Sequence, residues 1–310
     1  MIHINKGFIP AILLLLISIT LPLWAGGFLT NASILFLLYI SIAEFWSFMA
    51  KHARIVSLGQ QMFIGVGGYS TAVLCMYFGL QLWVSVLIAG LIGCGLACLL
   101  SFPLLRLRGF YFAIGTMLAS EVIKLIFTGW EFVGAGMGLI FRNAYGIAAS
   151  IIYYPALILA LLSIFLIYYL YHSKLGFGLR ALGEDEDASS ALGISSFKCK
   201  ALCFILASLI ASYAGAIYAV FHPYLEPVSA FHILWTTSLV FISVIGGVGT
   251  ITGPVVGSAI YVALIYVLSQ YIGLSLLLQG IIVLVFLMVF PQGLWGFVAT
   301  KLKLKFKPPV

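Results

Sequence analysis

Charged residues are scarce in this sequence. Asp, Glu, Lys and Arg make up 7% of the 310 residues, and 64% are hydrophobic, whereas a soluble domain carries about 25% charged residues. So few charges cannot cover a surface that faces water. Composition therefore excludes a soluble globular domain, and no polar stretch is long enough to form a separate one. Most of the surface must face lipid.

Motifs of enzyme chemistry are also missing. The sequence contains no H-E-x-x-H, no G-x-S-x-G and no Walker A motif, so the chain has no ATPase site of that type. The five cysteines form no disulfide framework. Cys94 and Cys98 have the spacing of a metal pair, but no further Cys or His is close in sequence, which favours helix packing. We expect no catalytic residue, bound metal or bound cofactor, and an intramembrane enzyme is the weakest alternative.

Long apolar runs dominate the remaining sequence, for example residues 151–170 and 274–290. A spanning helix needs roughly 20 apolar residues, whereas barrel strands alternate polar and apolar residues. The sequence therefore predicts an all-α membrane protein, a polytopic bundle of about ten transmembrane helices in one domain, 1–310. The first span is interpreted as uncleaved, because further spans follow it. The predicted spans are 8–25, 30–50, 56–78, 82–102, 109–128, 150–171, 200–220, 232–248, 253–270 and 274–290.

The basic residues indicate the orientation. If the N-terminus is cytoplasmic, 13 of the 15 Lys and Arg residues fall on the inside, and only Lys124 and Arg142 fall at the outer side. Cytoplasmic loops are enriched in Lys and Arg, so both termini are predicted to be cytoplasmic. The basic tail, 298–310, suits an anionic inner leaflet. A re-entrant Gly-rich segment in place of two spans would lower the count to eight.

Half of the acidic residues stand together in the largest inner segment, 173–199. Acidic residues favour the start of a helix, and a glycine favours its end, so a short helix is predicted at the membrane surface. Such a charge run is usually a solvated connection, and docking against a partner is the alternative. The candidate residues are Arg180, Glu184, Asp185, Glu186, Asp187, Ala188, Ala191 and Gly193.

Small residues at helix-packing spacing occur in three segments, 57–71, 207–219 and 246–257. Such residues let helix backbones approach closely, and Gly-interrupted segments can expose backbone groups to a substrate. Ionisable residues within spans are candidates as well, although Glu121 and Lys124, one turn apart, can neutralise each other. Candidates for a substrate path or for tight helix packing are Gln60, Gly65, Gly67, Tyr69, Tyr111, Thr116, Glu121, Gly246, Gly247, Gly249 and Gly253.

Five blocks, in order between about residues 40 and 297, resemble the LivM-type permease subunits of branched-chain amino-acid ABC importers. The blocks are Ser57-Leu58-Gly59 to Tyr69; Arg108–Ile114 with Thr116 and Glu121; Arg180-Ala181-Leu182 with the acidic cluster and Ala191-Leu192-Gly193; Gly246-Gly247-x-Gly249 with Gly253-Pro254 and Gly257; and Phe290–Gly296. Each block is modest alone, and their common order makes the resemblance strong.

The resemblance implies a multi-pass permease of a bacterial inner membrane that moves branched-chain or other small amino acids by alternating access. It implies a second, LivH-like permease chain, two cytoplasmic ATPases that use ATP, an extracytoplasmic solute-binding protein, and a coupling helix near 184–193 in a groove of an ATPase. Gln60 stands where the family usually has His, and Val133-Gly134-Ala135 where it often has Thr-Gly-Gly. The substrate therefore stays open, with urea, short amides, nucleosides or sugars as alternatives. A stand-alone channel or secondary carrier is the alternative of another class.

Overall fold

The computed structural model describes residues 18–268 and isolated residues between 277 and 294. The helices are α2 (Gly27–His52), α3 (Gln60–Met76), α4 (Leu82–Leu104), α5 (Phe110–Gly129), α6 (Ala149–His172), α7 (Lys174–Glu184), α8 (Glu186–Ala191), α9 (Ser196–Phe221), α10 (Pro227–Ala230), α11 (Leu234–Gly246) and α12 (Thr252–Leu268). Between α5 and α6 lie three 3-10 helices, η1 (Glu131–Val133), η2 (Ala135–Met137) and η3 (Arg142–Ala144), and strand β1 (Leu139–Ile140). Strand β2 (Tyr224–Leu225) follows α9.

The predicted all-helical membrane architecture is confirmed, but the count of ten spans is not. Among the described residues, six helical segments are long and apolar enough to cross a membrane: α2, α4, α5, α6, α9 and the segment from α10 to α11. The apolar helix α12 is shorter, with 17 residues, and α3 also has 17 residues. Spans 8–25 and 274–290 lie largely outside the described residues, and the basic tail 298–310 lies wholly outside them.

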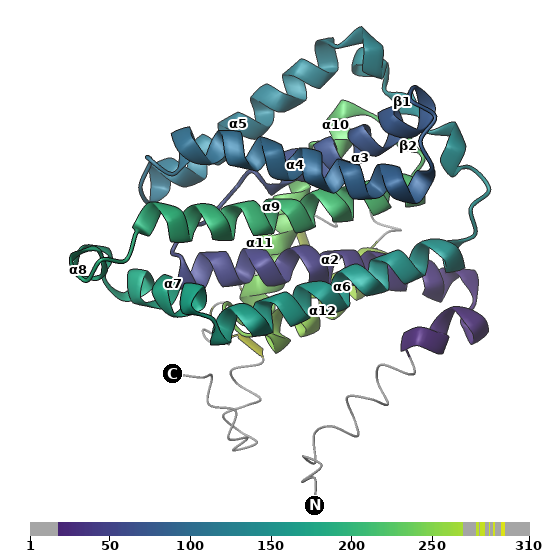
Figure 1. The fold of residues 1–310 in the computed structure, drawn as a ribbon. Coiled ribbons are helices and arrows are strands. Elements are labelled where there is room, and N and C mark those ends of the chain that lie inside the picture. The colour runs from purple at the N-terminus through teal and green to yellow at the C-terminus, as the bar shows by residue number, and fades with distance from the viewer. Residues whose placement is uncertain are drawn as a thin grey trace, which may run out of the picture.

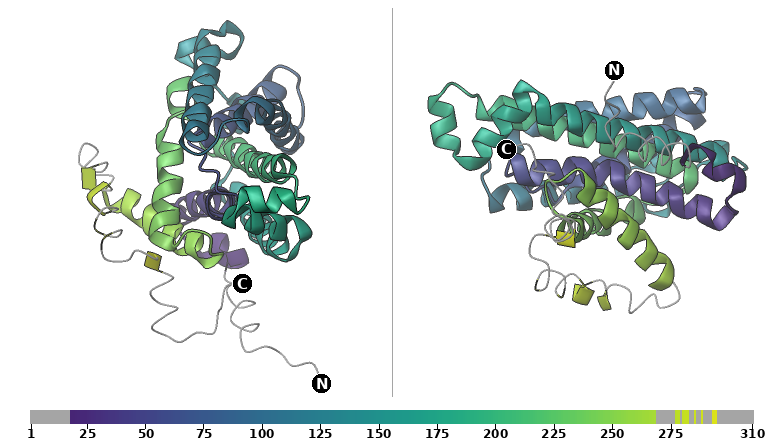
Figure 2. Two further views of the ribbon diagram at one scale, coloured as in Figure 1. Left: turned by 90° about the vertical axis from the view of Figure 1, so that its left-hand side faces the viewer. Right: turned by 90° about the horizontal axis from the view of Figure 1, so that it is seen from below.

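Helices α2 and α9 form the centre of the bundle (Figure 1). Helix α9 packs against α2, α3, α4 and α6, while α2 also contacts α11 and α12. In the most apolar 18-residue stretch of each helix, 78% of the residues of α2 and 67% of those of α9 are buried, but only 22% of those of α5. Figure 2 shows the helices from two further directions, with α11 and α12 on the side of α2 away from α4. Helix α5 thus lies at the edge of the chain.

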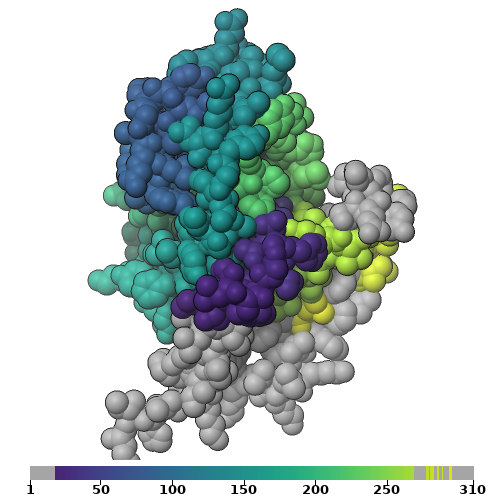
Figure 3. Space-filling model, turned by 90° about the vertical axis from the view of Figure 1, so that its right-hand side faces the viewer, coloured from purple at the N-terminus to yellow at the C-terminus, as the bar shows by residue number. Residues whose placement is uncertain are grey.

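The connections between the helices gather at two opposite ends of the bundle (Figure 1). At one end, here called the strand end, β1 pairs with β2 in antiparallel register, Leu139 opposite Leu225. The Phe141 N–H also donates to the Pro223 carbonyl there, at 2.7 Å. Figure 3 looks onto the strand end, where the teal segment between α5 and α6 lies beside blue α3–α4 and the green segment after α9.

The opposite end, here called the basic end, contains α7, α8 and the connections that follow α2, α4 and α11. Eight of the ten described Lys and Arg residues lie at this end: Lys51, Arg54, Arg106, Arg108, Lys174, Arg180, Lys198 and Lys200. Only Lys124 and Arg142 lie toward the strand end. Most of the described basic residues therefore lie at the end of the bundle opposite the strand pair.

Candidate functional site

Helices α3 and α9 approach each other so closely that their backbones are in contact. Gly67 faces the Ser212 carbonyl of α9, and Gly215 faces the Ile64 carbonyl of α3, so that a Cβ on either glycine would overlap backbone atoms. The Ser212 hydroxyl donates to the Phe63 carbonyl at 3.1 Å. Small residues permit such backbone approach in lipid. Gly67, a candidate for a substrate path or for tight helix packing, lies at this contact.

Gln61, next to the predicted Gln60, joins three helices inside the bundle. Its amide nitrogen donates to the Ser120 hydroxyl of α5 at 2.8 Å, and its amide oxygen accepts from the Thr236 hydroxyl of α11. Thr116 of α5 makes a second connection to this region, because its hydroxyl oxygen accepts from the N–H of Leu58, just before α3, at 3.0 Å. These polar bonds hold the peripheral helix α5 and the helix α11 against α3.

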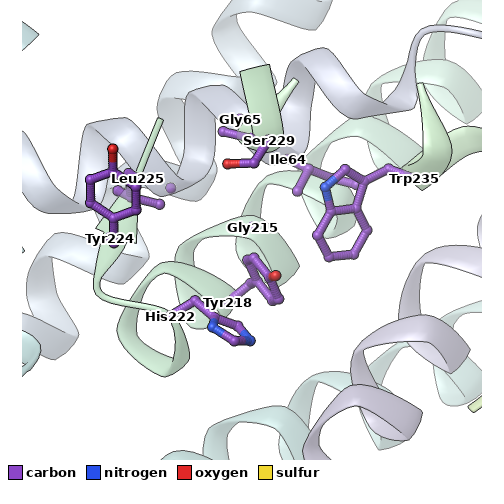
Figure 4. Close-up of a pocket in the computed structure, with 11 residues that line it drawn as sticks. Ile64, Gly65, Gly215, Tyr218, His222, Tyr224, Leu225, Ser229 and Trp235 are labelled. Carbon is purple, nitrogen blue, oxygen red and sulfur yellow. The ribbon is translucent and has the colours of Figure 1, made fainter. Parts of the chain in front are cut away.

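A cavity of about 170 Å³ lies beside the α3–α9 contact, toward the strand end (Figure 4). An engineered apolar cavity of about 150 Å³ holds a benzene molecule, so this space suits one small solute. It is lined from α3, α9, α10, α11 and β2 by Ile64, Gly65, Gly68, Gly215, Tyr218, His222, Tyr224, Leu225, Ser229, Ala230 and Trp235. The predicted residue Gly65 is part of this lining.

The cavity lining combines aromatic rings with a few hydrogen-bonding groups and contains no Asp, Glu, Lys or Arg. The Tyr218 ring lies edge-on to the Trp235 ring, with their centroids 4.8 Å apart, and also contacts the His222 imidazole. Burial lowers the pKa of His222, which follows the end of α9, so its imidazole is neutral at pH 7. Such a lining recognises an uncharged or zwitterionic small molecule by shape and hydrogen bonds.

Tyr69 connects the cavity wall to the strand pair. It is fully buried, its hydroxyl donates to the Leu225 carbonyl at 3.1 Å, and its ring stacks on Phe231. The Phe231 ring in turn fills the space beside Gly65, where a Cβ would overlap it. The predicted residues Gly65 and Tyr69 are therefore brought together through Phe231.

At the basic end, the bundle is closed by hydrogen bonds to the segment between α11 and α12. The Tyr171 hydroxyl at the end of α6 donates to the Gly249 carbonyl and lies 2.8 Å from the His52 imidazole of α2. The Gly249 N–H donates to the Ser47 hydroxyl at 2.8 Å. The predicted glycines Gly246, Gly247, Gly249 and Gly253 form this break between helices; Gly246 lies against Gly253, and Gly247 and Gly249 have positive φ of 118° and 80°.

The four clustered acidic residues have different surroundings. Asp185 is the N-cap of α8, where its carboxylate accepts from the Asp187 and Ala188 N–H groups at 3.0 and 2.9 Å. Glu186 turns back toward the start of α9, while Glu184 and Asp187 are exposed. The predicted short helix is thus confirmed as α8, and two of the four acids are free to meet a partner.

Glu186 pairs with Lys200 of α9 at 2.7 Å and accepts a hydrogen bond from the Ser196 hydroxyl. Burial alone would raise the pKa of Glu186. The hydrogen bonds from Lys200 and Ser196, with the positive charges of Lys200 and Arg108, outweigh that effect and hold the pKa below its ordinary value. Glu186 is therefore ionised at neutral pH.

The other predicted residues of the acidic segment lie around α8. Ala188 and Ala191 are exposed, and exposed Gly193 ends the helix with a φ of 86°. The Arg180 guanidinium donates to the Tyr171 carbonyl at 3.1 Å, which ties α7 to the end of α6. A hollow of about 620 Å³ separates α7 and α8 from the connection between α4 and α5.

The structure does not bring every predicted residue to these regions. Tyr111 is 73% exposed on α5, and Glu121, on the same helix, is partly exposed and forms an ion pair with Lys124. Neither lines the cavity. Gln60 is buried in α3, and its amide has no hydrogen-bond partner among the described residues; the same holds for one carboxylate oxygen of buried Glu44.

Among the cavity residues that the sequence-based prediction did not name, the aromatic side chains Tyr218, His222 and Trp235 matter most for the chemistry of the lining. A signal was present for the first two, because they stand four apart at the outer end of a predicted span and so share one helix face. Nothing in the sequence indicated that Trp235 lies beside them. Within the described part of the chain, no group of three metal-binding side chains occurs.

Comparisons with known proteins agree with the resemblance. A family model described as "Branched-chain amino acid transport system / permease component" matches residues 26–290. The "High-affinity branched-chain amino acid transport system permease protein LivM" of Salmonella typhimurium is 27% identical over 97% of this chain and 77% of its own length. The protein of the same name from Escherichia coli K12 is 28% identical over the same shares.

A LivH protein is also similar. The "Probable branched-chain amino acid transport permease protein LivH" of Methanocaldococcus jannaschii is 27% identical over 61% of this chain and 59% of its own length. No solved structure matches this chain. The family model extends over both the aromatic cavity and the acidic segment. The chain therefore belongs to the family of permease components of branched-chain amino-acid transport systems.

Proposed function

We propose that this chain is the transmembrane permease subunit of an ATP-binding-cassette importer that moves branched-chain or other small amino acids. The observation that carries the proposal is the small, uncharged, aromatic cavity beside the α3–α9 contact, within the region matched by the family model. Its size suits one small solute, and its hydroxyl and imidazole groups provide hydrogen bonds for polar atoms of that solute. The whole chain, 1–310, serves as one permease domain.

Alternating access fits the arrangement of the two ends. The cavity lies toward the strand end, while hydrogen bonds that involve Tyr171, His52 and Ser47 join the helices at the basic end. A solute released at the strand end would enter the cavity while the basic end is closed. Opening the Tyr171–Gly249 contact would then let the solute leave on the other side. Gly246, Gly247 and Gly253 supply the close contacts and the backbone freedom for that change.

The energy for this change comes from partner subunits, because the chain has no ATPase motif of its own. In this proposal, α8 docks in a groove of a cytoplasmic ATPase through exposed Glu184, Asp187, Ala188 and Ala191. Two ATPases serve this chain and a second permease chain. The similarity to a LivH protein supports a related second permease. An extracytoplasmic binding protein delivers the solute at the strand end.

The proposed orientation puts both termini and the basic end in the cytoplasm, with about ten spans in the inner membrane. This orientation is supported by the position of eight of the ten described basic residues at one end, since Lys and Arg are enriched in cytoplasmic loops. Single cysteines in a cysteine-free variant test it. Asn143→Cys should react with a membrane-impermeant maleimide in intact cells, and Asp187→Cys only after permeabilisation. The reverse pattern would contradict the orientation.

Transport itself is tested in proteoliposomes that contain this chain, its second permease and the ATPases, with the binding protein outside. Import of leucine, isoleucine or valine should require ATP and the binding protein. Uptake without ATP would instead indicate a channel or secondary carrier. Because no charged group lines the cavity, urea or a short amide is the second candidate substrate. A ligand screen of the binding protein decides between these solutes and amino acids.

A further inference from the structure

One ion pair ties the acidic segment to the central helix of the bundle. Glu186 of α8 contacts Lys200 at 2.7 Å and accepts from the Ser196 hydroxyl, and both partners stand in the first two turns of α9. The Lys200 side chain is 15% exposed and that of Glu186 is 34% exposed. The pair is therefore half-buried at the junction of α8 and α9, and Arg108 adds a second positive charge near Glu186.

Without this pair, α8 is joined to α9 by a short turn. Gly193, with a φ of 86°, and exposed Ser195 belong to that turn. The Gly193 and Ile194 N–H groups donate back to carbonyls of α8, and the Ser195 carbonyl accepts from the Cys199 N–H in the first turn of α9. Within the described part of the chain, the Glu186–Lys200 pair and the Ser196 hydrogen bond are the polar side-chain contacts between α8 and α9.

Helix α9 extends from this junction to the cavity. Its 26 residues contain no proline and form a helix about 39 Å long at 1.5 Å per residue. Midway, Ser212 and Gly215 contact the backbone of α3. At the far end, Tyr218 and His222 line the cavity. A rigid displacement of the first turn of α9 would thus change both the α3–α9 contact and the cavity wall.

We propose that Glu186 is a positioning residue of the transporter, which couples movement of α8 to α9, and through α9 to the aromatic cavity, by its pair with Lys200. This inference rests on the proposed function, in which an ATPase moves α8. It assigns the four acids different roles. Asp185 starts α8, Glu184 and Asp187 face the partner, and Glu186 transmits the movement inward.

The test uses the complete transporter in proteoliposomes and measures two quantities: ATP hydrolysed and amino acid imported. The variants are Glu186→Lys, Lys200→Glu and the exchange of both charges. Lys198→Glu is the matched control, because Lys198 is exposed in the same turn and makes no ion pair among the described residues. Each variant is first checked for an unchanged melting temperature and for co-purification with the ATPases.

Each single variant should lower import per ATP by roughly two- to fivefold, the range expected from losing one ion pair at this exposure. The charge exchange should restore most of the loss, and Lys198→Glu should match the wild type. The inference would be overturned if the single variants imported as much amino acid per ATP as the wild type. It would also be overturned if the double variant with exchanged charges imported no more per ATP than the single variants. A wild-type complex that imports without ATP would contradict the proposed function instead.

Discussion

Replacing Gly215 by alanine should destabilise the bundle, because the glycine faces backbone and not a flexible side chain. A Cβ at this position would overlap the carbonyl oxygen, carbonyl carbon and Cα of Ile64. Backbone atoms of a packed helix cannot rotate away, so α3 and α9 must separate along their contact. Overpacking of this kind costs about 1–3 kcal/mol. At roughly 2–4 °C per kcal/mol in chains of 150–250 residues, the melting temperature should fall by roughly 2–12 °C.

Thermal unfolding can be followed with a thiol-reactive dye on the purified chain in detergent. Cys203 and Cys75 are buried and react only when the helices separate, whereas exposed Cys98 contributes to the starting signal. Gly95→Ala is the matched control. Gly95 is also inside a helix, α4, but has no atom within 4 Å of its added Cβ, so this change should be neutral or stabilising by up to about 1 kcal/mol.

Equal melting temperatures for Gly215→Ala and Gly95→Ala would refute the argument that backbone contact holds α3 to α9. A higher melting temperature for Gly215→Ala than for the wild type would refute it as well. Gly67→Ala provides an independent check, because its Cβ would overlap the Ser212 carbonyl from the other side of the same contact. The two variants should therefore shift the melting temperature in the same direction.

Three further predictions concern polar contacts. Gln61→Leu removes hydrogen bonds to two neighbouring helices and should destabilise the chain by about 1 kcal/mol. Thermal unfolding measures this change, and Gln81→Leu, at an exposed position, is the control that should have no effect. Tyr171→Phe removes the bond to the α11–α12 segment and should cost about 1 kcal/mol in the same assay; Tyr168→Phe, an exposed ring, should not. Because the pKa of His222 is lowered, its contribution to stability is complete above pH 6.5 and is lost as the pH falls through its folded-state pKa. The melting temperature of the wild type should thus fall more steeply below pH 6.5 than that of His222→Gln, and parallel curves would contradict this.

The acidic segment shows how far sequence patterns reach. Acids before a short apolar stretch and a following glycine predicted a helix at this position, and α8 with Asp185 as its N-cap agrees. The pattern treated the four acids as one group. Only the folded chain separates Glu186 from Asp187, because Lys200 is 14 residues away and approaches when α9 packs beside α8. Sequence patterns report on residues within a few positions of each other. The Glu186–Lys200 contact depends instead on how the connection between α8 and α9 orients the two helices.

Sequence alone determined that the chain is a bundle of apolar helices and predicted most of its basic residues on one side, because lipid imposes composition, span length and charge distribution on every segment separately. The family also follows from the order of short motifs. The tertiary structure decided which helix faces meet. It placed Tyr218, His222 and Trp235 around one cavity, set Gly67 and Gly215 against the backbones of the opposite helices, and left Tyr111 and Glu121 on an outer face of α5. An apolar helix in lipid is hydrophobic on all sides, so its sequence period does not say which face is buried, and only packing does.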